Sequence, residues 1–385
     1  MSNKVPQIRF NGYSDAWVQR KFGELIKSYV EKTTINNQYP VLTSSQQGLM
    51  LQQEYFADNQ VTSVDNVGYF VLPKGYATYR SRSDNGVFKF NVNHIIDKGV
   101  ISYFYPVFYS KTQNIDFLTI TLNETQKHQV SILAEGTGQK VLSLNKLKSL
   151  KPSVPSIEEQ DTIVAFFTIL DNLIAANQRK LDLLKEQKKG YLQKMFPKNG
   201  AKVPELRFAG FADDWEERKL SDIADRFDNL RVPITASDRK SGDTPYYGAN
   251  GIQDYVEGFT HDGEFILVAE DGANDLKNYP VQYVNGKVWV NNHAHVLQGK
   301  KTITDNKFLM NSIKNFNIEP FLVGGGRAKL NADVMMKLNV LLPTFEEQEK
   351  IGSFFKQLDD TITLHQRKLD LLKEQKKGLL QKMFV

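Results

Sequence analysis

The sequence from Gln178 to Phe196 reads QRKLDLLKEQKKGYLQKMF, and the sequence from Gln366 to Phe384 reads QRKLDLLKEQKKGLLQKMF. The two stretches differ only at Tyr191, which corresponds to Leu379 in the second copy. Agreement this close, at a distance of 188 positions, shows that the chain contains an internal repeat. Leu, Lys, Glu and Gln favour helices and no proline interrupts either copy, so both copies are predicted to be helical.

Each predicted helix begins with the same pattern. Ser156 precedes Glu159 by three residues, and in the second copy Thr344 precedes Glu347 by three residues. This spacing predicts a capping box, in which the hydroxyl accepts a hydrogen bond from the third helical N–H and the carboxylate accepts one from the N–H of the capping residue. We therefore expect each helix to begin at the residue directly after the hydroxyl.

Apolar residues in each copy alternate in steps of four and three, which is the spacing of a coiled-coil seam. The predicted seam residues are Leu170, Ile174, Asn177, Leu181, Leu184, Leu358, Ile362, His365, Leu369 and Leu372. A helix of ~40 residues is ~60 Å long at ~1.5 Å per residue, and the intervening chain must return across that length. We therefore expect an antiparallel coiled coil. Asn177 and His365 either fix the register of the pair or are simply tolerated there.

The composition sets limits on the class of protein. The chain has 385 residues, enough for two or three domains, and it has no cysteine, which excludes disulfides and thiolate metal sites. No apolar run approaches the ~20 residues of a membrane span, and the N-terminus lacks the apolar region of a signal peptide. We expect a soluble, cytoplasmic protein with no membrane partner. The net charge of +5 permits a polyanionic partner without requiring one.

A second repeat marks the start of each half. The segment Val5–Trp17 (VPQIRFNGYSDAW) returns as Val203–Trp215 (VPELRFAGFADDW). Between the repeats, short β-branched and aromatic runs separated by Gly, Asn, Asp and Pro predict an α+β head around a mostly antiparallel sheet in each half. The predicted segments are a first head at 1–154, a spacer helix at 155–197, a second head at 198–342 and a second spacer helix at 343–385. The middles of the two heads do not align with each other.

The sequence shows no catalytic motif. Neither Gly-Lys pair is followed by a hydroxyl residue, as the phosphate loop of a nucleotide-driven motor requires. The chain has no Pro-Pro pair and so lacks the motif of amino-methyltransferases that act on DNA. His293 and His295 could face a metal from one strand, but without a third ligand a structural role is expected and no metal site is predicted. Two unlike heads on a common scaffold suit recognition of two different things at a set distance, and a bipartite, asymmetric DNA site is one such target.

Over essentially the whole chain, these features resemble the specificity (S) subunit of type I restriction-modification enzymes. The resemblance lies in the tandem layout, the repeated helix, the helix starts PSIEEQ (155–160) and PTFEEQ (343–348), and the Val-Pro-x-[Ile/Leu]-Arg-Phe-x-Gly start of each head. Further similar motifs lie within the heads at 39–48, 245–251, 269–273 and 291–296.

The resemblance implies what the chain does and what it binds. The heads would be target recognition domains that read a bipartite site in double-stranded DNA, and the helices would space them and dock two methyltransferase (M) subunits. Restriction (R) subunits, which carry motor and nuclease activities, would complete the bacterial complex. This chain would be non-catalytic and bind no cofactor, because S-adenosylmethionine, ATP and magnesium belong to the partner subunits. The alternatives are a free-standing two-headed DNA-binding regulator and a scaffold that binds only proteins.

The candidate DNA-binding residues have side chains that can read base edges or bind phosphate. Gln and Asn suit adenine and Arg suits guanine, whereas Lys positions phosphates without specifying a sequence. The candidates are Ser44, Ser45, Gln46, Gln47, Arg80, Arg82, Tyr246, Tyr247, Asn250, Arg327 and Lys329. For each of them, a structural or solvent-facing role is the alternative.

Overall fold

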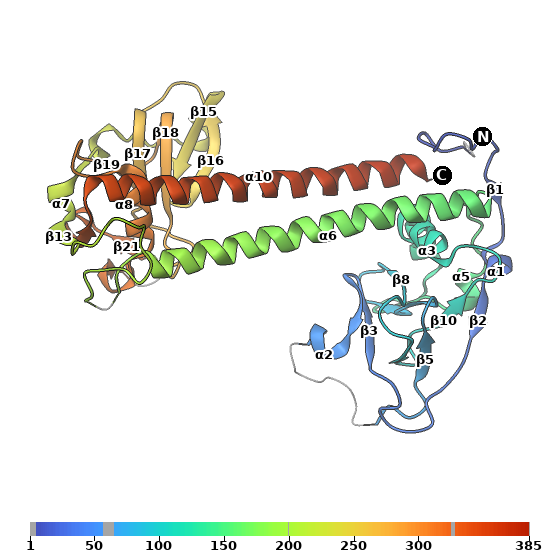
Figure 1. Ribbon diagram of the computed structural model, residues 1–385. Helices are drawn as coiled ribbons and strands as arrows, with labels where there is room; N and C mark the ends of the chain where they lie inside the picture. The colour runs from blue at the N-terminus through green and yellow to red at the C-terminus, as the bar shows by residue number, and fades with distance from the viewer. Residues whose placement is uncertain (1–4, 57–64, 199, 325–327, 385) are drawn as a thin grey trace. The chain divides into compact units, whose positions relative to one another are not determined.

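The computed structural model describes residues 5–56, 65–198, 200–324 and 328–384. The chain forms two compact units, Met1–Ala176 together with Leu369–Val385, and Asn177–Lys368. Each unit contains one head and a part of each of two long helices, α6 (Ile157–Lys194) and α10 (Phe345–Met383) (Figure 1). In the described part of the chain, no helix combines the length and the apolar character needed to cross a membrane.

Both long helices begin at the predicted residues, but the glutamate of each predicted capping box binds an arginine. In α6, the Glu159 N–H donates to Ser156 Oγ at 3.3 Å, as expected. The Glu159 carboxylate instead accepts two hydrogen bonds from the Arg9 guanidinium, at 2.6 and 2.7 Å. Glu347 accepts the same pair of bonds from Arg207, at 2.7 and 2.8 Å. Both glutamates are fully buried, and a buried carboxylate is better satisfied by a charged bidentate partner than by one backbone N–H.

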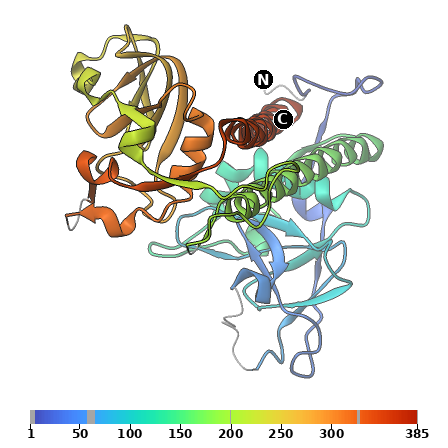
Figure 2. The ribbon, with the colours of Figure 1, turned by 60° about the vertical axis from the view of Figure 1, so that its left-hand side comes forward.

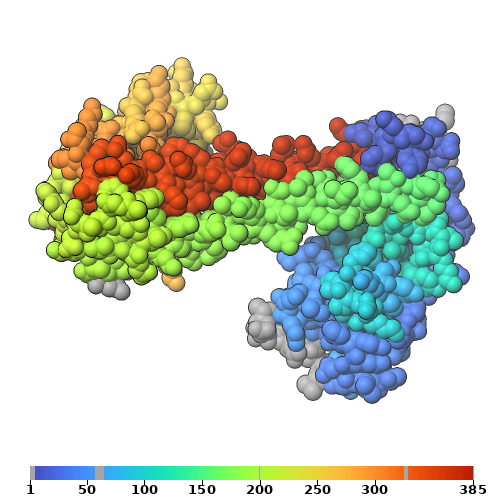
Figure 3. Space-filling model, viewed as in Figure 1, coloured from blue at the N-terminus to red at the C-terminus, as the bar shows by residue number. Residues whose placement is uncertain are grey.

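Within each unit, α6 and α10 lie side by side and run in opposite directions (Figures 1 and 3). In the first unit Lys376 on α10 binds Asp171 on α6 at 2.5 Å, and in the second unit Lys188 on α6 binds Asp359 on α10 at 2.5 Å. The two ion pairs are counterparts in the repeat, because each residue of one pair lies 188 positions from its equivalent in the other. The predicted antiparallel packing is therefore confirmed in both units.

The predicted seam residues are all buried or partly buried. Those that are buried are Asn177, Leu181, Leu184 and Leu369, and the remaining six are partly buried. Leu183 and Leu371, which occupy equivalent positions outside the seam, are 52% and 58% exposed. The Nδ1 atom of His365 is buried and has no hydrogen-bond partner among the described residues, so that atom does not fix the register of the helices.

The first head is assembled from short strands. Its largest sheet is antiparallel with the order β2–β10–β6–β8, formed by Lys27–Tyr29, Val107–Tyr109, Ala77–Tyr79 and Phe90–Val92. Separate two-stranded ladders are β3 (Leu42–Ser45) with β4 (Gly48–Leu51), β5 (Phe70–Pro73) with β9 (Lys98–Ile101), β7 (Arg82–Ser83) with β11 (Lys140–Val141), and β1 (Val18–Gln19) with β12 (Ser153–Val154). Its helices are α1 (Phe22–Leu25), α2 (Gln52–Tyr55), α3 (Ile115–Glu124), α4 (Lys127–Leu133) and α5 (Leu144–Leu147), of which α3 packs on β8.

The second head has one continuous six-stranded sheet (Figure 2). Its order is β14–β19–β17–β18–β15–β16, formed by Ala224–Arg226, Ala294–Gly299, His261–Ala269, Val281–Val290, Ser241–Gly248 and Gly251–Val256. Only the β15–β18 contact is parallel in this sheet, so the mostly antiparallel prediction is confirmed. The smaller elements are β13 (Glu216–Lys219) with β22 (Asn339–Leu342), β20 (Leu322–Val323) with β21 (Lys329–Leu330), α7 (Leu220–Ile223), α8 (Asn306–Lys314) and α9 (Ala332–Met335).

Each head is anchored on the long helices by the same contacts. In the first unit the ring centre of Trp17 lies 6.1 Å from that of Phe384 at the end of α10, and the Ile8 N–H donates to the last turn of α10. In the second unit Trp215 lies 6.0 Å from Phe196 after the end of α6, and the Leu206 N–H donates to the last turn of α6. We call the two long helices with the segments 5–17 and 203–215 the frame. The repeated sequence therefore corresponds to a repeated set of contacts.

Candidate nucleic-acid interface

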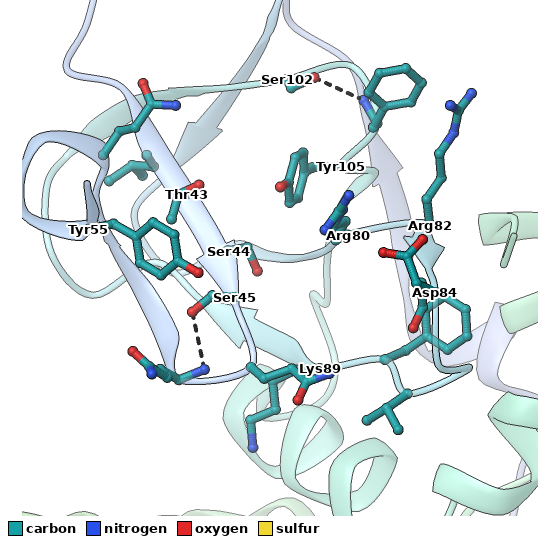
Figure 4. A pocket seen from close by; sticks show the side chains of 18 of the residues that line it. Thr43, Ser44, Ser45, Tyr55, Arg80, Arg82, Asp84, Lys89, Ser102 and Tyr105 are labelled. Atoms are coloured by element: carbon teal, nitrogen blue, oxygen red, sulfur yellow. Dashed lines mark hydrogen bonds between the residues drawn. The ribbon is translucent and has the colours of Figure 1, made fainter. Parts of the chain in front are cut away.

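The six candidate residues of the first head lie around one hollow. It has a volume of about 870 Å³ and lies between the hairpin β3–β4, the segment that follows β6 and the segment that follows β9 (Figure 4). Its lining includes Ser44, Ser45, Gln46, Gln47, Arg80 and Arg82. The fold thus brings together two motifs that are more than thirty residues apart in the sequence.

Gln46 and Gln47 form the two-residue tip of the hairpin β3–β4. Ser45 pairs with Gly48 across the tip, and its Oγ accepts from the Gln47 N–H at 3.1 Å and donates to the Gly48 carbonyl at 3.2 Å. Gly48 has φ of 133°, a conformation that side chains rarely tolerate and glycine adopts readily. Both glutamines are exposed, so their amide groups are available to the edge of a base such as adenine.

Ser44 connects this hairpin to the main sheet of the first head. It is buried, and its Oγ accepts a hydrogen bond of 2.7 Å from Asn91 Nδ2 on β8. The same amide group donates to the Ser45 carbonyl at 3.1 Å. These two bonds hold the base of the hairpin in place, so Ser44 has a structural role in addition to its place in the lining of the hollow.

Arg80 and Arg82 supply positive charge to the hollow. Both are exposed, and neither forms an ion pair with an acidic side chain in the described ranges. The Arg82 guanidinium carbon lies 4.0 Å from the ring centre of Phe104, a cation–π contact that orients it. Figure 4 shows the Arg80 side chain directed between Ser44 and Tyr105, with Arg82 on the wall beside it. Two guanidinium groups without acidic partners can bind phosphate oxygens.

Three further residues of the lining were not predicted. Tyr55 is 42% exposed, Tyr105 follows β9, and Lys89 precedes β8. Burial raises the pKa of the Tyr105 hydroxyl, so this group remains protonated and can donate a hydrogen bond. Burial lowers the pKa of the Lys89 amine. Aromatic and basic residues near turns were visible in the sequence, but which turns face each other depends on long-range strand pairing.

In the second head, the two candidate tyrosines lie within the sheet. Tyr246 is only 1% exposed, its hydroxyl donates to the Ile234 carbonyl at 3.3 Å, and the Arg239 guanidinium carbon lies 4.3 Å from its ring centre. Tyr247 is partly buried against the other face, and burial raises the pKa of its hydroxyl. In this structure both residues contribute to packing within the second head.

Asn250 lies in a hairpin tip that resembles the tip in the first head. Gly248 pairs with Gly251, so Ala249 and Asn250 form a two-residue tip between β15 and β16. The Asn250 amide, however, donates to the Gly272 carbonyl and accepts from the Asn274 N–H, both at 2.9 Å. Because both ends of the amide bind the loop after β17, Asn250 positions that loop. The loop also has exposed polar side chains that can form hydrogen bonds, among them Asn274, Lys277 and Asn278, and these were not predicted as site residues.

Lys329 is held by an acidic residue of the second head. Its Nζ lies 2.9 Å from Glu270 Oε1, and the other carboxylate oxygen of Glu270 lies 2.7 Å from Arg231 Nη1. Although burial opposes ionisation, the hydrogen bonds from Arg231 and Lys329 hold the pKa of Glu270 below its usual value. The predicted partner of Lys329 in this region, Arg327, lies outside the described residues.

Within the described residues, Asp228, Glu270 and His295 bring possible metal ligand atoms within 4.8 Å of one another. His295 Nδ1 lies 2.7 Å from Asp228 Oδ2, and its Nε2 lies 2.9 Å from the Leu330 carbonyl. Both ring nitrogens lie within hydrogen-bond distance of an oxygen atom of the protein, so each already has a partner in this network. Despite burial, the hydrogen bonds from His295 and from the Val296 N–H hold the pKa of Asp228 below its usual value. The cluster is a buried ion network.

The match to a known protein family also has two parts, one in each half of the chain. Residues 15–186 and 212–374 match the type I restriction modification DNA specificity domain. The chain is 44% identical over 154 residues to a type I restriction enzyme specificity subunit of Haemophilus influenzae. The aligned region covers 40% of this chain and 39% of the relative. The chain is 22% identical over 264 residues to the MjaX specificity subunit of Methanocaldococcus jannaschii, which covers 65% and 62%. Both matches thus span less than two thirds of the relative's length.

The fold of the whole chain also has a known counterpart. The crystal structure of the S subunit of a type I restriction-modification system from M. genitalium has a TM-score of 0.69 to this chain and covers 99% of both chains. The identity is 15%, so this likeness concerns the fold.

Proposed function

The chain belongs to the type I restriction modification DNA specificity family, whose domain matches both halves, and from this premise we propose that it is the subunit that selects the DNA target. It reads a bipartite, asymmetric site in double-stranded DNA, one half-site with each head. It docks two methyltransferase subunits and, through them, restriction subunits. The chain itself is non-catalytic, and S-adenosylmethionine, ATP and magnesium act in the partner subunits of this bacterial cytoplasmic complex.

The observation that carries the proposal is the contrast between a repeated frame and unlike heads. Arg9 with Glu159 and Arg207 with Glu347 form the same buried ion pair in both units, and Trp17 and Trp215 pack in the same way. The heads between these contacts have different sheets. Two equal parts of the frame can dock two copies of one partner. Two unlike heads can read two different half-sites.

The repeated helices support the proposal of two equivalent docking sites. Leu183 on α6 and Leu371 on α10 are equivalent in the repeat, and each is more than half exposed. Because the repeat gives these two leucines the same neighbours in sequence, a partner that contacts one copy can contact the other in the same way. Two such positions fit two methyltransferase subunits.

The most direct test of this function is a map of methylated adenines in the genome, with and without the gene. We expect methylation at one bipartite motif to disappear when the gene is deleted and to return when it is supplied again. Unchanged methylation with a co-purifying methyltransferase would contradict the proposal. Salt-dependent binding to a defined duplex separates both DNA-binding functions from a protein scaffold. A chain that binds DNA but does not co-purify with a methyltransferase would favour a free-standing regulator.

A further inference from the structure

The hollow of the first head presents hydrogen-bond donors and positive charge toward the same space. Arg80 and Arg82 reach it from the segment around β7, and the hydroxyls of Thr43, Tyr55 and Tyr105 also line it. The acidic residue of the lining, Asp84, accepts a hydrogen bond of 2.9 Å from Gln139 Nε2, and its carboxylate does not form an ion pair with either arginine. Neither guanidinium group is therefore paired with a carboxylate in the described part of the protein.

Guanidinium and hydroxyl groups together match the chemistry of a phosphodiester. Arginine presents a planar set of donors that bind phosphate oxygens in pairs, and Ser, Thr and Tyr hydroxyls are common phosphate donors in DNA complexes. Phe104 fixes the plane of Arg82, so less side-chain freedom is lost when a phosphate binds. For a subunit that selects a DNA target, the phosphodiester that binds here would belong to a DNA strand. This identification of the ligand rests on the function proposed above.

The hairpin tip lies at the edge of the same hollow. Gln46 and Gln47 are exposed and belong to its lining, while the hydrogen bonds of Ser45 and Asn91 hold the hairpin rigid. A two-stranded β-ribbon is narrow enough to enter the major groove of DNA. A strand whose phosphates lie in the hollow would therefore present its base edges to the tip.

We propose that the hollow holds the sugar–phosphate backbone of one DNA strand at the first half-site, with Arg80 and Arg82 on phosphates and Gln46 and Gln47 against base edges. The two arginines then supply affinity for any DNA sequence, and the two glutamines supply selectivity for the half-site. Loss of a phosphate contact weakens binding to all sequences and makes the salt dependence less steep, whereas loss of a base contact reduces the preference for the correct half-site.

The test uses the full-length chain and two duplexes. One duplex carries the motif defined by the methylation map, and the other carries the same motif with the first half-site scrambled. For Arg80→Gln we expect binding to both duplexes to weaken by the same factor, roughly tenfold at ~0.1 M salt, and the slope of log K against log salt to decrease by about one. For the double change Gln46→Ala and Gln47→Ala we expect a smaller preference for the intact motif and an unchanged slope.

Lys111→Gln is the matched control, because Lys111 is an exposed cation of the same head outside the hollow. It should leave the affinity and the salt slope close to those of the unmodified chain. Arg80→Lys keeps the charge and should keep the slope, and thermal melting of each variant shows whether it is folded. A folded Arg80→Gln variant that binds as the unmodified chain does, or that loses binding only to the intact motif, would overturn the phosphate assignment. If the unmodified chain binds neither duplex, the proposed function fails and not the hollow alone.

Discussion

Arg9 and Arg207 bind the first turns of α6 and α10 through the same two hydrogen bonds, yet the heads that follow these arginines have different sheets. The first head consists of a four-stranded sheet with separate ladders around a hollow, whereas the second has one continuous six-stranded sheet. The residues that are alike in the two halves are those of the frame. Similar sequence is therefore retained where both halves perform the same structural role, and it is absent where the sheets of the two heads differ.

The two hairpin tips show the same contrast on a smaller scale. Both have two residues, and the glycine after each tip, Gly48 or Gly251, has a positive φ. Gln46 and Gln47 are exposed beside the hollow, whereas the Asn250 amide is used at both ends to hold a neighbouring loop. The same turn geometry thus leaves the side chains of the tip exposed in the first head, whereas in the second head a side chain of the tip positions a neighbouring loop.

The largest effect is expected from changing the frame in both halves at once. If α6 and α10 set the distance between the heads, one extra heptad after Leu181 and one after Leu369 would preserve the seam and add ~10 Å, at ~1.5 Å per residue. On B-DNA this corresponds to ~3 base pairs at ~3.4 Å each. We expect methylation of the original motif to be lost, and any remaining methylation to occur at a motif with a longer spacer. Full methylation at the original spacing would show that something else sets the distance.

The buried ion pairs should be equivalent in the two units. Arg207→Ala leaves the fully buried Glu347 carboxyl without its partner, which is expected to reduce the free energy of unfolding by about 3–5 kcal/mol. Arg9→Ala should have an effect of the same size, because Glu159 is equally buried. Urea unfolding measures both. Arg218→Ala is the control, since its pair with Glu216 is exposed, and a large loss in only one of the two units would contradict a shared frame.

We expect ionised carboxylates to contribute more to the stability of the second head than to that of the first head. The hydrogen bonds of Glu270 lower its pKa in the folded state despite burial, so its contribution to stability is present above its usual pKa of 4.5 and is lost as the pH falls through the lower folded value. We expect the stability difference between the unmodified chain and Glu270→Gln to decrease below about pH 4.5. Urea unfolding from pH 7 to pH 3 tests this. Glu31→Gln, at a more exposed carboxylate of the first head, should show the same trend with a smaller amplitude.

The smallest expected effect concerns Asn250. Asn250→Ala removes two exposed hydrogen bonds, which should reduce the free energy of unfolding by about 1–2 kcal/mol. If the loop after β17 reads the second half-site, this change should relax selectivity there and leave the first half-site unaffected. Competition binding with duplexes altered in one half-site at a time measures this. A loss of selectivity at the first half-site would show that the heads are not independent.

The frame could be predicted from the sequence because its information is local and is present twice. The apolar spacing around Leu181 and Leu369 and the hydroxyls Ser156 and Thr344 located both helices. The predicted partner of the capping-box carboxylate was wrong. Glu159 binds Arg9, 150 positions away, and no local pattern indicates that contact. Long-range contacts of this kind are set by packing of the head start on the helix.

The heads were predicted less completely. Alternation of short apolar runs indicated strands, but not the strand order that gathers Ser44 with Arg80 and Arg82 around one hollow. Residue type alone suggested Tyr246, although the register of β15 turns its ring into the core, and Lys329, although Glu270 binds it. Whether a polar side chain is free or already paired depends on strands far apart in the sequence.

The central claim is that two independent heads read two half-sites on one frame, and an exchange of heads tests it most directly. Residues 18–134, within the predicted first head at 1–154, would be replaced with the corresponding residues of another family member, and methylated adenines would be mapped genome-wide. We expect a motif in which one half changes while the other half and the spacer remain those of the unmodified chain. A motif altered in both halves would contradict the claim.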